Sequence, residues 1–254
     1  MQPFRPDFAA AEVAPSPNFG ERRGVPAPDL LLLHYTGMKT AEEALARLCD
    51  PASEVSSHYF VFEDGRVAQL VPEARRAWHA GVSSWEGSSD TNSRSIGIEI
   101  ANPGHEFGYP DFPPRQIKAL IALCQDIVAR HRIRADHVLA HSDVSPDRKQ
   151  DPGEKFPWRQ LHKAGVGHWV TPSRGGKGTA LKVGDGGADV LALQEELATY
   201  GYGISTSGEF DQVTADVVSA FQRHFRPARV DGVADASTRI TLQKLLVTRP
   251  TIAA

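Results

Sequence analysis

The sequence predicts an α/β domain, with a mixed central β-sheet flanked by helices, followed by a small all-α domain of three helices. Strand-like and helical patterns alternate over roughly the first 165 residues, a stretch rich in Pro, Gly and Ser follows at 171–178, and only helical patterns come after it. The length of 254 residues exceeds that of one average domain. We therefore expect an N-terminal extension at 1–24, an α/β domain at 25–168, a linker at 169–180 and a helical domain at 181–248.

The first strand and the first helix carry clear local signals. Residues 29–35 form a continuous apolar run, which is typical of a strand buried on both faces. Thr40 and Glu43 then form a capping-box pair, in which each side chain can accept a hydrogen bond from the backbone N–H of the other residue. We expect a helix over the two turns that follow.

The next segments predict a hairpin and a strand with one polar face. Residues 58–62 and 67–71 flank an Asp-Gly turn, which is typical of a tight hairpin. Residues 95–100 alternate isoleucines with a polar series that contains Gly97 and Glu99. Because glycine has no side chain, we expect this polar face to be open beside Glu99.

A long helix and a short strand complete the α/β domain. Pro114 begins an apolar stripe at helical spacing that continues to Val128, and residues 138–140 form a short strand ending at His141. Residues 142–157 are rich in Asp, Pro, Lys and Gly, so we expect a loop there that is ordered only if something pins it.

The helical domain contains a small internal duplication. Three apolar stripes at helical spacing lie within residues 190–197, 213–221 and 240–245. Two of these stripes share an entry signal, because Asp211 stands three residues before Thr214 and Asp235 stands three residues before Thr238. A repeated helix start of this kind predicts a three-helix module.

The composition excludes several classes of partner. The chain has 28 basic and 31 acidic side chains, and a formal charge of −3 supplies no field for nucleic acid or for an anionic membrane. No apolar stretch approaches the roughly 18 residues of a membrane span. Residues 1–18 lack the pattern of a secretory signal, so we expect a cytoplasmic protein. Cys49 and Cys124 are not spaced like a disulfide framework.

Two of the ten histidines stand at the ends of apolar strands. These are His34 and His141, and Asp151 follows ten residues after the second. Two imidazoles and one carboxylate are the ligands of a three-ligand zinc site with an open fourth position. From spacing alone, His34 could equally be a core histidine with a hydrogen-bond partner. Five further histidines are expected to be solvated or to cap helices: His131, His137, His162, His168 and His224.

Five motifs follow one another in a recognisable order. They are His34 after an apolar strand, Trp78-His-Ala-Gly81, Ser95-Ile-Gly-Ile-Glu99, His141-Ser-Asp143 and Arg148-Lys-Gln-Asp-Pro-Gly153. Together they resemble the zinc-dependent N-acetylmuramoyl-L-alanine amidases of the AmpD/AmiD type, the amidase type 2 family. The helical tail is similar to the peptidoglycan-binding domain that often follows such enzymes.

The resemblance implies hydrolysis of the amide between N-acetylmuramic acid, in its 1,6-anhydro form, and the L-alanine of the stem peptide. It places one Zn²⁺ per chain on His34, His141 and Asp151, and the catalytic roles on Glu99 and Lys149. The residue types suit this chemistry, since a zinc-bound water is a nucleophile near neutral pH, a carboxylate can move its proton and a cation can stabilise the oxyanion. Taken singly, Glu99 could be a solvated edge-strand residue and Lys149 an ordinary loop charge.

Four further residues are candidates for substrate contacts: Trp78, His79, Asn92 and Arg94. The first two could wall the cleft, with a core tryptophan as the alternative, and the last two could meet peptide carboxylates, with surface charge as the alternative. One departure from the family concerns position 57. Some phage members place a tyrosine directly before the histidine that corresponds to His58, whereas this chain has Ser57, so a role for that tyrosine is not carried over, although Tyr59 is adjacent.

Two biological settings compete for such an enzyme. A recycling amidase acts on small anhydro-muropeptides in the cytoplasm, whereas a wall-lytic amidase acts on polymeric peptidoglycan in the periplasm. The missing signal favours the first setting, and the wall-binding module favours the second unless that module packs against the catalytic domain. We expect the recycling enzyme, with a muropeptide or peptidoglycan as its partner. A peptidoglycan-recognition protein that binds without cutting is the rival class.

Overall fold

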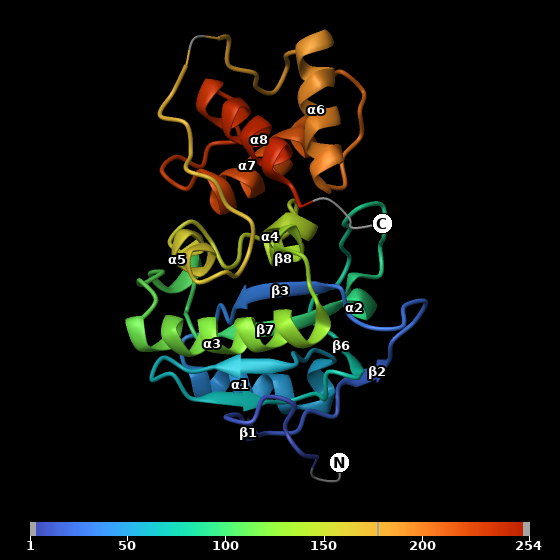
Figure 1. Ribbon diagram of the computed structural model, residues 1–254, viewed down its shortest axis with the longest axis vertical. Coiled ribbons are helices and arrows are strands. Elements are labelled where there is room, and N and C mark those ends of the chain that lie inside the picture. Colours follow the sequence, from blue (N-terminus) through green and yellow to red (C-terminus); the bar gives the residue numbers. More distant parts are fainter. Residues whose placement is uncertain (1–3, 177, 251–254) are drawn as a thin grey trace.

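A six-stranded mixed sheet forms the centre of the N-terminal part of the chain (Figure 1). The computed structural model describes residues 4–176 and 178–250. In sheet order the strands are β1 (Glu12–Val13), β5 (Val67–Gln69), β4 (Tyr59–Val61), β7 (Ser95–Ile100), β3 (Leu30–Tyr35) and β8 (Val138–Ala140). β4 and β5 form the predicted antiparallel hairpin, and the other neighbours pair parallel, so the mixed sheet is confirmed. A separate antiparallel ribbon consists of β2 (Phe19–Glu21) and β6 (Arg75–Ala77).

Helices cover both faces of the sheet and make up the C-terminal part. In chain order they are α1 (Ala41–Cys49), α2 (Thr91–Arg94), α3 (Pro114–His131), α4 (His141–Val144), α5 (Trp158–Lys163), α6 (Ala188–Tyr200), α7 (Gln212–Phe225) and α8 (Ala236–Thr248). α1 begins as predicted, with the Thr40 hydroxyl accepting from the backbone N–H of Glu43 at 3.2 Å. α3 lies along one face of the sheet and α1 along the other, with the C-terminal helices beyond β3 and β8 (Figure 1).

β3 is buried on both faces because two different layers cover it. Leu31 and Leu33 pack in one hydrophobic cluster with α3, whereas Leu30 and Leu32 pack in another with the helical domain. Successive side chains of a strand point to opposite faces, which explains this division. All four leucines have 0% exposed surface. The predicted doubly buried strand is confirmed, and its second covering layer is the C-terminal domain.

Part of the predicted N-terminal extension belongs to the sheet itself. β1 pairs parallel with β5, and Ala11 lies in the cluster that contains α3. The Arg22 guanidinium donates to the carbonyl oxygens of Glu73 at 2.8 Å and Ser93 at 2.7 Å. A two-residue strand carries no periodic signal, which is why the sequence did not reveal it. Within the described residues, the segment 1–24 is therefore an edge of the α/β domain.

The loop expected after the third strand pattern begins as a helix. α4 includes His141, and the Asp143 carboxylate accepts from the backbone N–H of Ala140 at 2.8 Å, which satisfies a donor at the start of the helix. Four residues are too few to show helical periodicity in the sequence. The prediction for 142–157 is wrong at its start, and the loop occupies only its later part.

The helical domain repeats one hydrogen-bonded unit, as its sequence predicted. The carboxylates of Asp211 and Asp235 accept from the backbone N–H groups of Thr214 and Thr238, both at 2.8 Å. In each case a buried glutamine of the preceding helix donates to the threonine hydroxyl, at 3.0 and 3.3 Å. The same unit fixes the starts of α7 and α8, and the three-helix arrangement is confirmed.

A fully buried carboxylate joins the two domains. Asp143 accepts from the Tyr202 hydroxyl at 2.7 Å and from the imidazole Nδ1 of His224 at 2.6 Å. The ring of Trp85 packs edge-on against that of Tyr202, with 5.1 Å between the ring centroids. The expectation that His224 is solvated or caps a helix is wrong, because its ring lies inside this interface. The helical domain therefore packs against the α/β domain.

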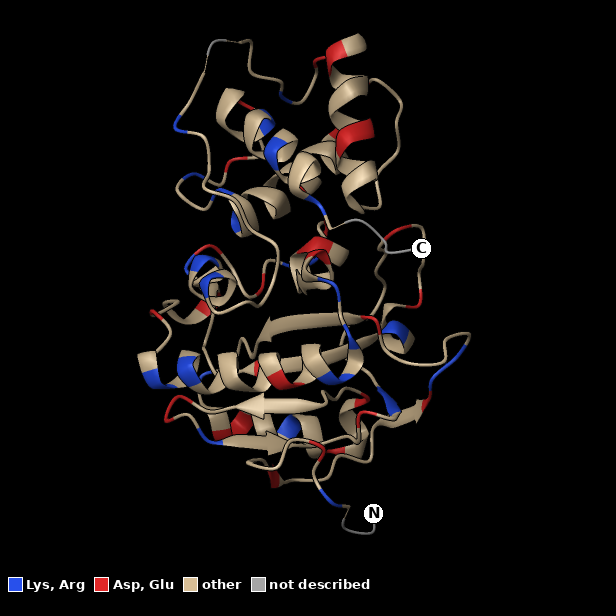
Figure 2. Cartoon of the chain, in the orientation of Figure 1, with Lys and Arg blue, Asp and Glu red and all other residues tan. Residues whose placement is uncertain are grey.

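Two features bear on the partner classes expected from composition: the distribution of charged residues and the length of the helices. Figure 2 shows positions of Lys and Arg interspersed with positions of Asp and Glu along the ribbon of both domains in this view. Among the residues that the structure describes, no helix combines the length and the apolar character needed to cross a membrane.

We expect the chain to unfold in a single transition and Tyr202→Phe to lower its melting temperature. The substitution leaves one oxygen of the buried Asp143 carboxylate without its donor. A hydrogen bond to a charged group contributes about 1.5–3 kcal/mol, which corresponds to about 3–12 °C for a chain of this size. Differential scanning calorimetry measures both quantities.

Tyr200→Phe is the matched control for this substitution. Its hydroxyl bonds His168 Nδ1 at 2.9 Å, and burial lowers the pKa of His168 to about 4, so the partner is neutral at pH 7. We expect a smaller fall, of about 1 kcal/mol. Two separate transitions in the unaltered chain, or equal falls for the two variants, would contradict the role given to Asp143.

Candidate active site

Three neighbouring strands bring candidate residues into one row. His34 on β3 stands directly opposite Glu99 on β7, and Leu33 stands opposite Ala140 on β8, so His141 follows at the level of His34. These strands are parallel, and their C-terminal ends meet at one edge, where open α/β sheets bind ligands. The row lies on the face opposite α3, between the part covered by α1 and the part covered by the helical domain.

The three residues expected to hold a metal converge at the end of this row. His34 Nδ1 lies 3.2 Å from Asp151 Oδ2, and His141 Nδ1 lies 3.0 Å from the same oxygen. The backbone N–H of Ser142 donates to the Asp151 carbonyl oxygen at 3.1 Å, which holds the incoming loop against α4. All three side chains are buried, and their potential donor atoms lie within 4.8 Å of one another. They could therefore hold one metal ion.

The protonation states of these groups favour the binding of a cation. Burial, and next the neighbouring His141, lower the pKa of His34 to about 4, so its imidazole is neutral at pH 7. Burial would raise the pKa of Asp151, but the imidazoles of His141 and His34 outweigh it and hold that pKa below its usual range. The site therefore presents a neutral imidazole beside an ionised carboxylate.

The far nitrogen of each ligand imidazole has its own partner. His34 Nε2 lies 3.0 Å from Nδ1 of His79, and His141 Nε2 lies 3.1 Å from the carbonyl oxygen of Ala80. His79 Nε2 in turn lies 3.3 Å from the Ser95 hydroxyl. If a metal were bound through Nδ1, Nε2–H would be the donor in both imidazoles, and these contacts would fix the tautomer and the ring plane. His79 thus contacts the ring of His34, and it also lines the cleft.

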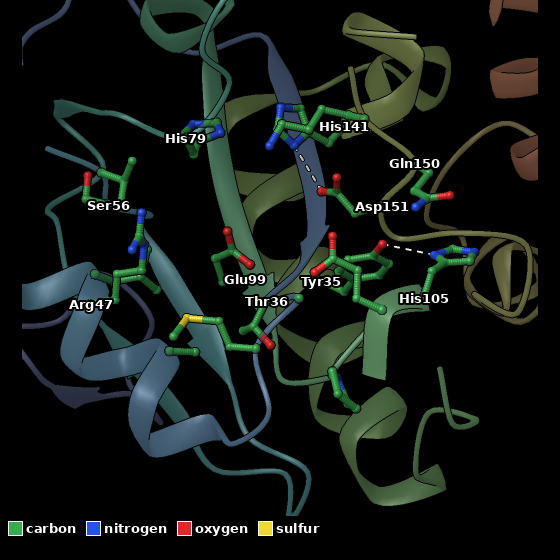
Figure 3. Close-up of a pocket in the computed structure, with 18 of the residues that line it drawn as sticks. Tyr35, Thr36, Arg47, Ser56, His79, Glu99, His105, His141, Gln150 and Asp151 are labelled. Atoms are coloured by element: carbon green, nitrogen blue, oxygen red, sulfur yellow. Dashed lines mark hydrogen bonds and ion pairs between the residues drawn. The ribbon is translucent and has the colours of Figure 1, made fainter. Parts of the chain in front are cut away.

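Glu99 is shielded by its neighbours, yet its carboxylate points into the cleft (Figure 3). Burial, and next the charge of Asp151, raise its pKa well above the usual range. Because β7 is a central strand, the alternative of a solvated edge-strand residue is wrong. The expectation of open space beside Gly97 is wrong too, because a Cβ there would lie 2.5 Å from the His79 ring. The glycine makes room for that ring.

The row opens into a cleft of about 510 Å³ (Figure 3). Both residues predicted to be catalytic, Glu99 and Lys149, line it. Trp78 lines it as well and is half-buried, as a wall residue would be. The structure therefore places two of the substrate-contact candidates, Trp78 and His79, in the wall of the cleft.

The other two candidates, Asn92 and Arg94, have structural partners instead. Asn92 Oδ1 accepts from the backbone N–H groups of His79 at 3.0 Å and Ala80 at 2.9 Å. Arg94 makes a bidentate contact with the carboxylate of Asp29, at 3.0 and 2.6 Å. Neither is among the described residues that line the cleft. The geometry thus assigns Asn92 to holding the segment that carries His79, and Arg94 to an ion pair.

Sequence reasoning missed a chain of polar side chains in the cleft wall. The Tyr35 hydroxyl lies 2.9 Å from His105 Nδ1 (Figure 3). Behind the wall, His105 Nε2 lies 3.1 Å from Glu154. The His105 ring also stacks on Tyr109, with 4.2 Å between ring centroids. Arg47 lies on the opposite side of the cleft (Figure 3). The one sequence signal was that Tyr35 directly follows the first ligand.

Tyr59 does not take the place of the tyrosine that this chain lacks at position 57. Its hydroxyl donates to the Glu73 carboxylate at 2.6 Å, and its ring is fully buried in the core. Tyr35, in contrast, lines the cleft.

A second group of potential ligands lies elsewhere. Glu86, Asp136 and His137 also offer atoms within 4.8 Å of one another. Arg249 donates to Asp136 at 2.7 Å and to Glu86 at 2.5 Å, and Arg134 pairs with Asp136 as well. Because guanidinium groups already compensate both carboxylates, this group is an ion-pair network that joins the end of α8 to the α/β domain.

Comparison with known families agrees with this arrangement. Residues 24–154 match the family described as N-acetylmuramoyl-L-alanine amidase, and residues 186–242 match a family of peptidoglycan binding domains. The first match spans about half of the chain and contains the three candidate ligands together with Glu99 and Lys149.

Similarity to individual proteins extends over both domains. The chain is 40% identical over 233 residues to the N-acetylmuramoyl-L-alanine amidase AmiD of Escherichia coli, which is 87% of this chain and 83% of AmiD. The structure of AmiD from E. coli with anhydro-N-acetylmuramic acid-L-Ala-D-γ-Glu-L-Lys matches with a TM-score of 0.76 at 36% identity, over 91% of this chain and 97% of that one. AmpDh3 of Pseudomonas aeruginosa matches with a TM-score of 0.74 at 30% identity, over 94% and 96%. The 1,6-anhydro-N-acetylmuramyl-L-alanine amidase AmpD of Enterobacter cloacae is 32% identical over 169 residues, which is 60% of this chain and 88% of AmpD.

Proposed function

Because the chain belongs to the N-acetylmuramoyl-L-alanine amidase family, we propose that it hydrolyses the amide joining the lactyl group of 1,6-anhydro-N-acetylmuramic acid to the L-alanine of the stem peptide. The observation that carries this proposal is the Glu99 carboxylate in an open cleft beside two imidazoles and a second carboxylate. The relatives support the choice of substrate, since AmiD was solved with an anhydro-muropeptide and AmpD is named for the anhydro sugar. Such a reaction belongs to muropeptide recycling.

We propose zinc as the metal of this site. Two imidazoles and one carboxylate are a donor set of catalytic zinc, which keeps a fourth position open. Tetrahedral bonds of about 2.0–2.1 Å place donor atoms about 3.3 Å apart. The separations of 3.0 and 3.2 Å from Asp151 to the two imidazoles are close to this value. When bound, zinc supplies an activated water and polarises the scissile carbonyl.

Glu99 and Lys149 have separate roles in this proposal: Glu99 transfers the proton, and Lys149 stabilises the oxyanion. The Glu99 carboxylate takes a proton from the attacking water and delivers it to the leaving nitrogen of L-alanine as the C–N bond breaks. Burial, and next the charge of Asp151, raise its pKa, which favours the protonated form that returns the proton to the leaving nitrogen. The Lys149 ammonium stands on the loop that carries Asp151 and stabilises the negative charge that develops on the carbonyl oxygen.

The cleft walls suit a sugar that carries an acidic peptide. Trp78 offers a ring face on which a sugar or a peptide group can pack. Arg47 and Arg148 also line the cleft, and guanidinium groups bind carboxylates in bidentate geometry. Stem peptides carry free carboxylates, so these residues favour the peptide-bearing substrate over a neutral sugar.

We propose a cytoplasmic location, as expected for an enzyme that recycles small muropeptides. The wall-binding module was the observation that favoured the periplasm. Its helices bury apolar side chains in one cluster with Leu30, Leu32 and Leu139 of the α/β domain. The module thus packs against the α/β domain of its own chain. Its presence can be explained by this structural role, without attachment to the cell wall.

We expect one zinc ion per chain, and loss of zinc in His141→Ala. In His79→Ala, zinc affinity should fall about 10–100-fold, because this residue orients the His34 ring without binding the ion. The matched control is His162→Ala, whose ring is exposed and bonds the Gly167 carbonyl oxygen. Elemental analysis and competition with a chromophoric chelator measure both effects. One equivalent of zinc retained in His141→Ala would contradict the assigned ligands.

Mass spectrometry of a reaction with purified anhydro-muropeptide tests the activity. We expect free peptide from the unaltered chain, and none after removal of the metal by a chelator. In Glu99→Gln we expect zinc to remain and turnover to fall by at least about 10²-fold, since proton transfer contributes 10²–10⁴-fold. Intact sacculi are assayed in parallel. Cleavage of sacculi alone would replace the recycling role with a wall-lytic one, and cleavage of neither substrate would favour a binding protein.

Cell fractionation tests the location. We expect the protein, detected with an antibody, to co-fractionate with a cytoplasmic marker enzyme in its native host. Recovery only with a periplasmic marker after osmotic shock would refute the proposed location and leave the amidase activity unaffected.

A further inference from the structure

A buried tyrosine hydroxyl holds the loop that directly follows Asp151. The Tyr109 hydroxyl donates to the backbone carbonyl oxygen of Pro152 at 2.7 Å and accepts from the backbone N–H of Lys155 at 3.0 Å. A phenol can donate one hydrogen bond and accept another, so both capacities are used. Tyr109 is 5% exposed, which keeps water from competing for these bonds.

The backbone of this loop lies directly on the hydroxyl. Gly153 has a φ of +84°, in the left-handed region that favours glycine. A Cβ at this position would collide with the Tyr109 hydroxyl and would lie 2.9 Å from Cε1 of His105. The loop can therefore reach the hydroxyl only with glycine at position 153.

The ring of Tyr109 is itself held in place. His105 stacks on it with 4.2 Å between ring centroids, and Phe112 packs edge-on at 6.3 Å. The backbone of Tyr109 has a φ of +36°, which is rare for a bulky residue, and its N–H donates to the Gly104 carbonyl oxygen at 2.8 Å. Such backbone strain persists only where the surrounding structure imposes it, and it clusters at functional sites.

Tyr109 also connects the loop to the strand that carries His34. The ring of His105, which stacks on Tyr109, has its Nδ1 2.9 Å from the hydroxyl of Tyr35, and Tyr35 directly follows His34 (Figure 3). Contacts through Tyr109 thus join the two segments that carry the candidate ligands His34 and Asp151. The distance of 3.2 Å between His34 Nδ1 and Asp151 Oδ2 depends on how these segments are held.

We propose that Tyr109 is a positioning residue of the active site, whose hydroxyl determines where the loop places Asp151 and Lys149. Tyr109 is not among the described residues that line the cleft, so it acts through the loop and not on a substrate. The roles of zinc and of Lys149 rest on the proposed function, whereas the contacts of the hydroxyl do not. Displacement of a catalytic group by about 1 Å can lower the rate about 10²-fold.

The variant Tyr109→Phe tests the proposal, because it keeps the ring and removes both hydrogen bonds of the hydroxyl. We expect the affinity for zinc to fall about tenfold, as for loss of an outer-shell partner, when measured by competition with a chromophoric chelator. With anhydro-muropeptide at saturating zinc, we expect kcat to fall about tenfold or more while KM changes little, since the cleft walls are unaltered.

Tyr59→Phe is the matched control. The Tyr59 hydroxyl is also buried in the same hydrophobic cluster, but it donates to the Glu73 carboxylate at 2.6 Å and does not line the cleft. Loss of a bond to a charged group should lower the melting temperature at least as much as Tyr109→Phe does. We expect zinc affinity and kcat to stay unchanged in this control. The same pattern in Tyr109→Phe would overturn the inference, because Tyr109 would then contribute to stability alone.

Amide hydrogen exchange of the metal-free chain gives a measurement that needs neither zinc nor activity. The Ser142 amide donates to the Asp151 carbonyl oxygen at 3.1 Å, so its exchange reports the position of the loop. In Tyr109→Phe we expect it to exchange faster relative to the core amides of β7, which report global unfolding. An unaltered chain that neither binds zinc nor cleaves muropeptide would reject the proposed function. Faster Ser142 exchange in the variant would then retain the positioning role, and equal exchange would overturn it.

Discussion

The arrangement of the active-site face depends on the buried charge of Asp151. An ionised carboxylate away from water is unfavourable unless cations or donors surround it. Here one imidazole on β3 and one directly after the adjacent strand β8 approach one carboxylate oxygen, although His34 lies 117 residues before Asp151. Those imidazoles need partners in turn, which explains why His79 stands behind His34 and why residue 97 is a glycine. Features scattered along the sequence thus serve one purpose, which is to compensate the buried charge of Asp151. A bound cation would compensate that charge further.

The helical domain also supports the active-site face, because it covers one side of β3. A strand made of four consecutive leucines must be covered on both faces, and α3 covers only one of them. The C-terminal helices cover the other and supply two of the donors to Asp143, on the short helix that begins with His141. A module that resembles a wall-binding domain therefore acts as a second layer of the catalytic domain. The catalytic face lies between this layer and α1.

The parts of the fold that could be predicted from the sequence are those whose signals are local. The capping pair at the start of α1, the Asp-Gly hairpin, the long stripe of α3 and the repeated Asp-Thr starts all depend on residues within a few positions. The parts that could not be predicted depend on distant partners. The ion pair of Arg94 joins residues 65 positions apart, and the contact of His224 with Asp143 joins residues 81 positions apart. The three ligands were recognised through motif order, whereas Tyr35 and His105 carried no motif.

The position of Asp143 in the chain has a consequence for the biosynthesis of the enzyme. Its two donors in the helical domain follow it by 59 and 81 residues, so they leave the ribosome later. Domains fold in the order in which they emerge. Until then, Leu30 and Leu32 of the nascent α/β domain lack their cover, and Asp143 on α4, the helix that begins at the candidate ligand His141, lacks two of its donors. Translation of the last helices supplies these two donors and covers the second face of β3, so the two domains become one packed unit only at the end of synthesis.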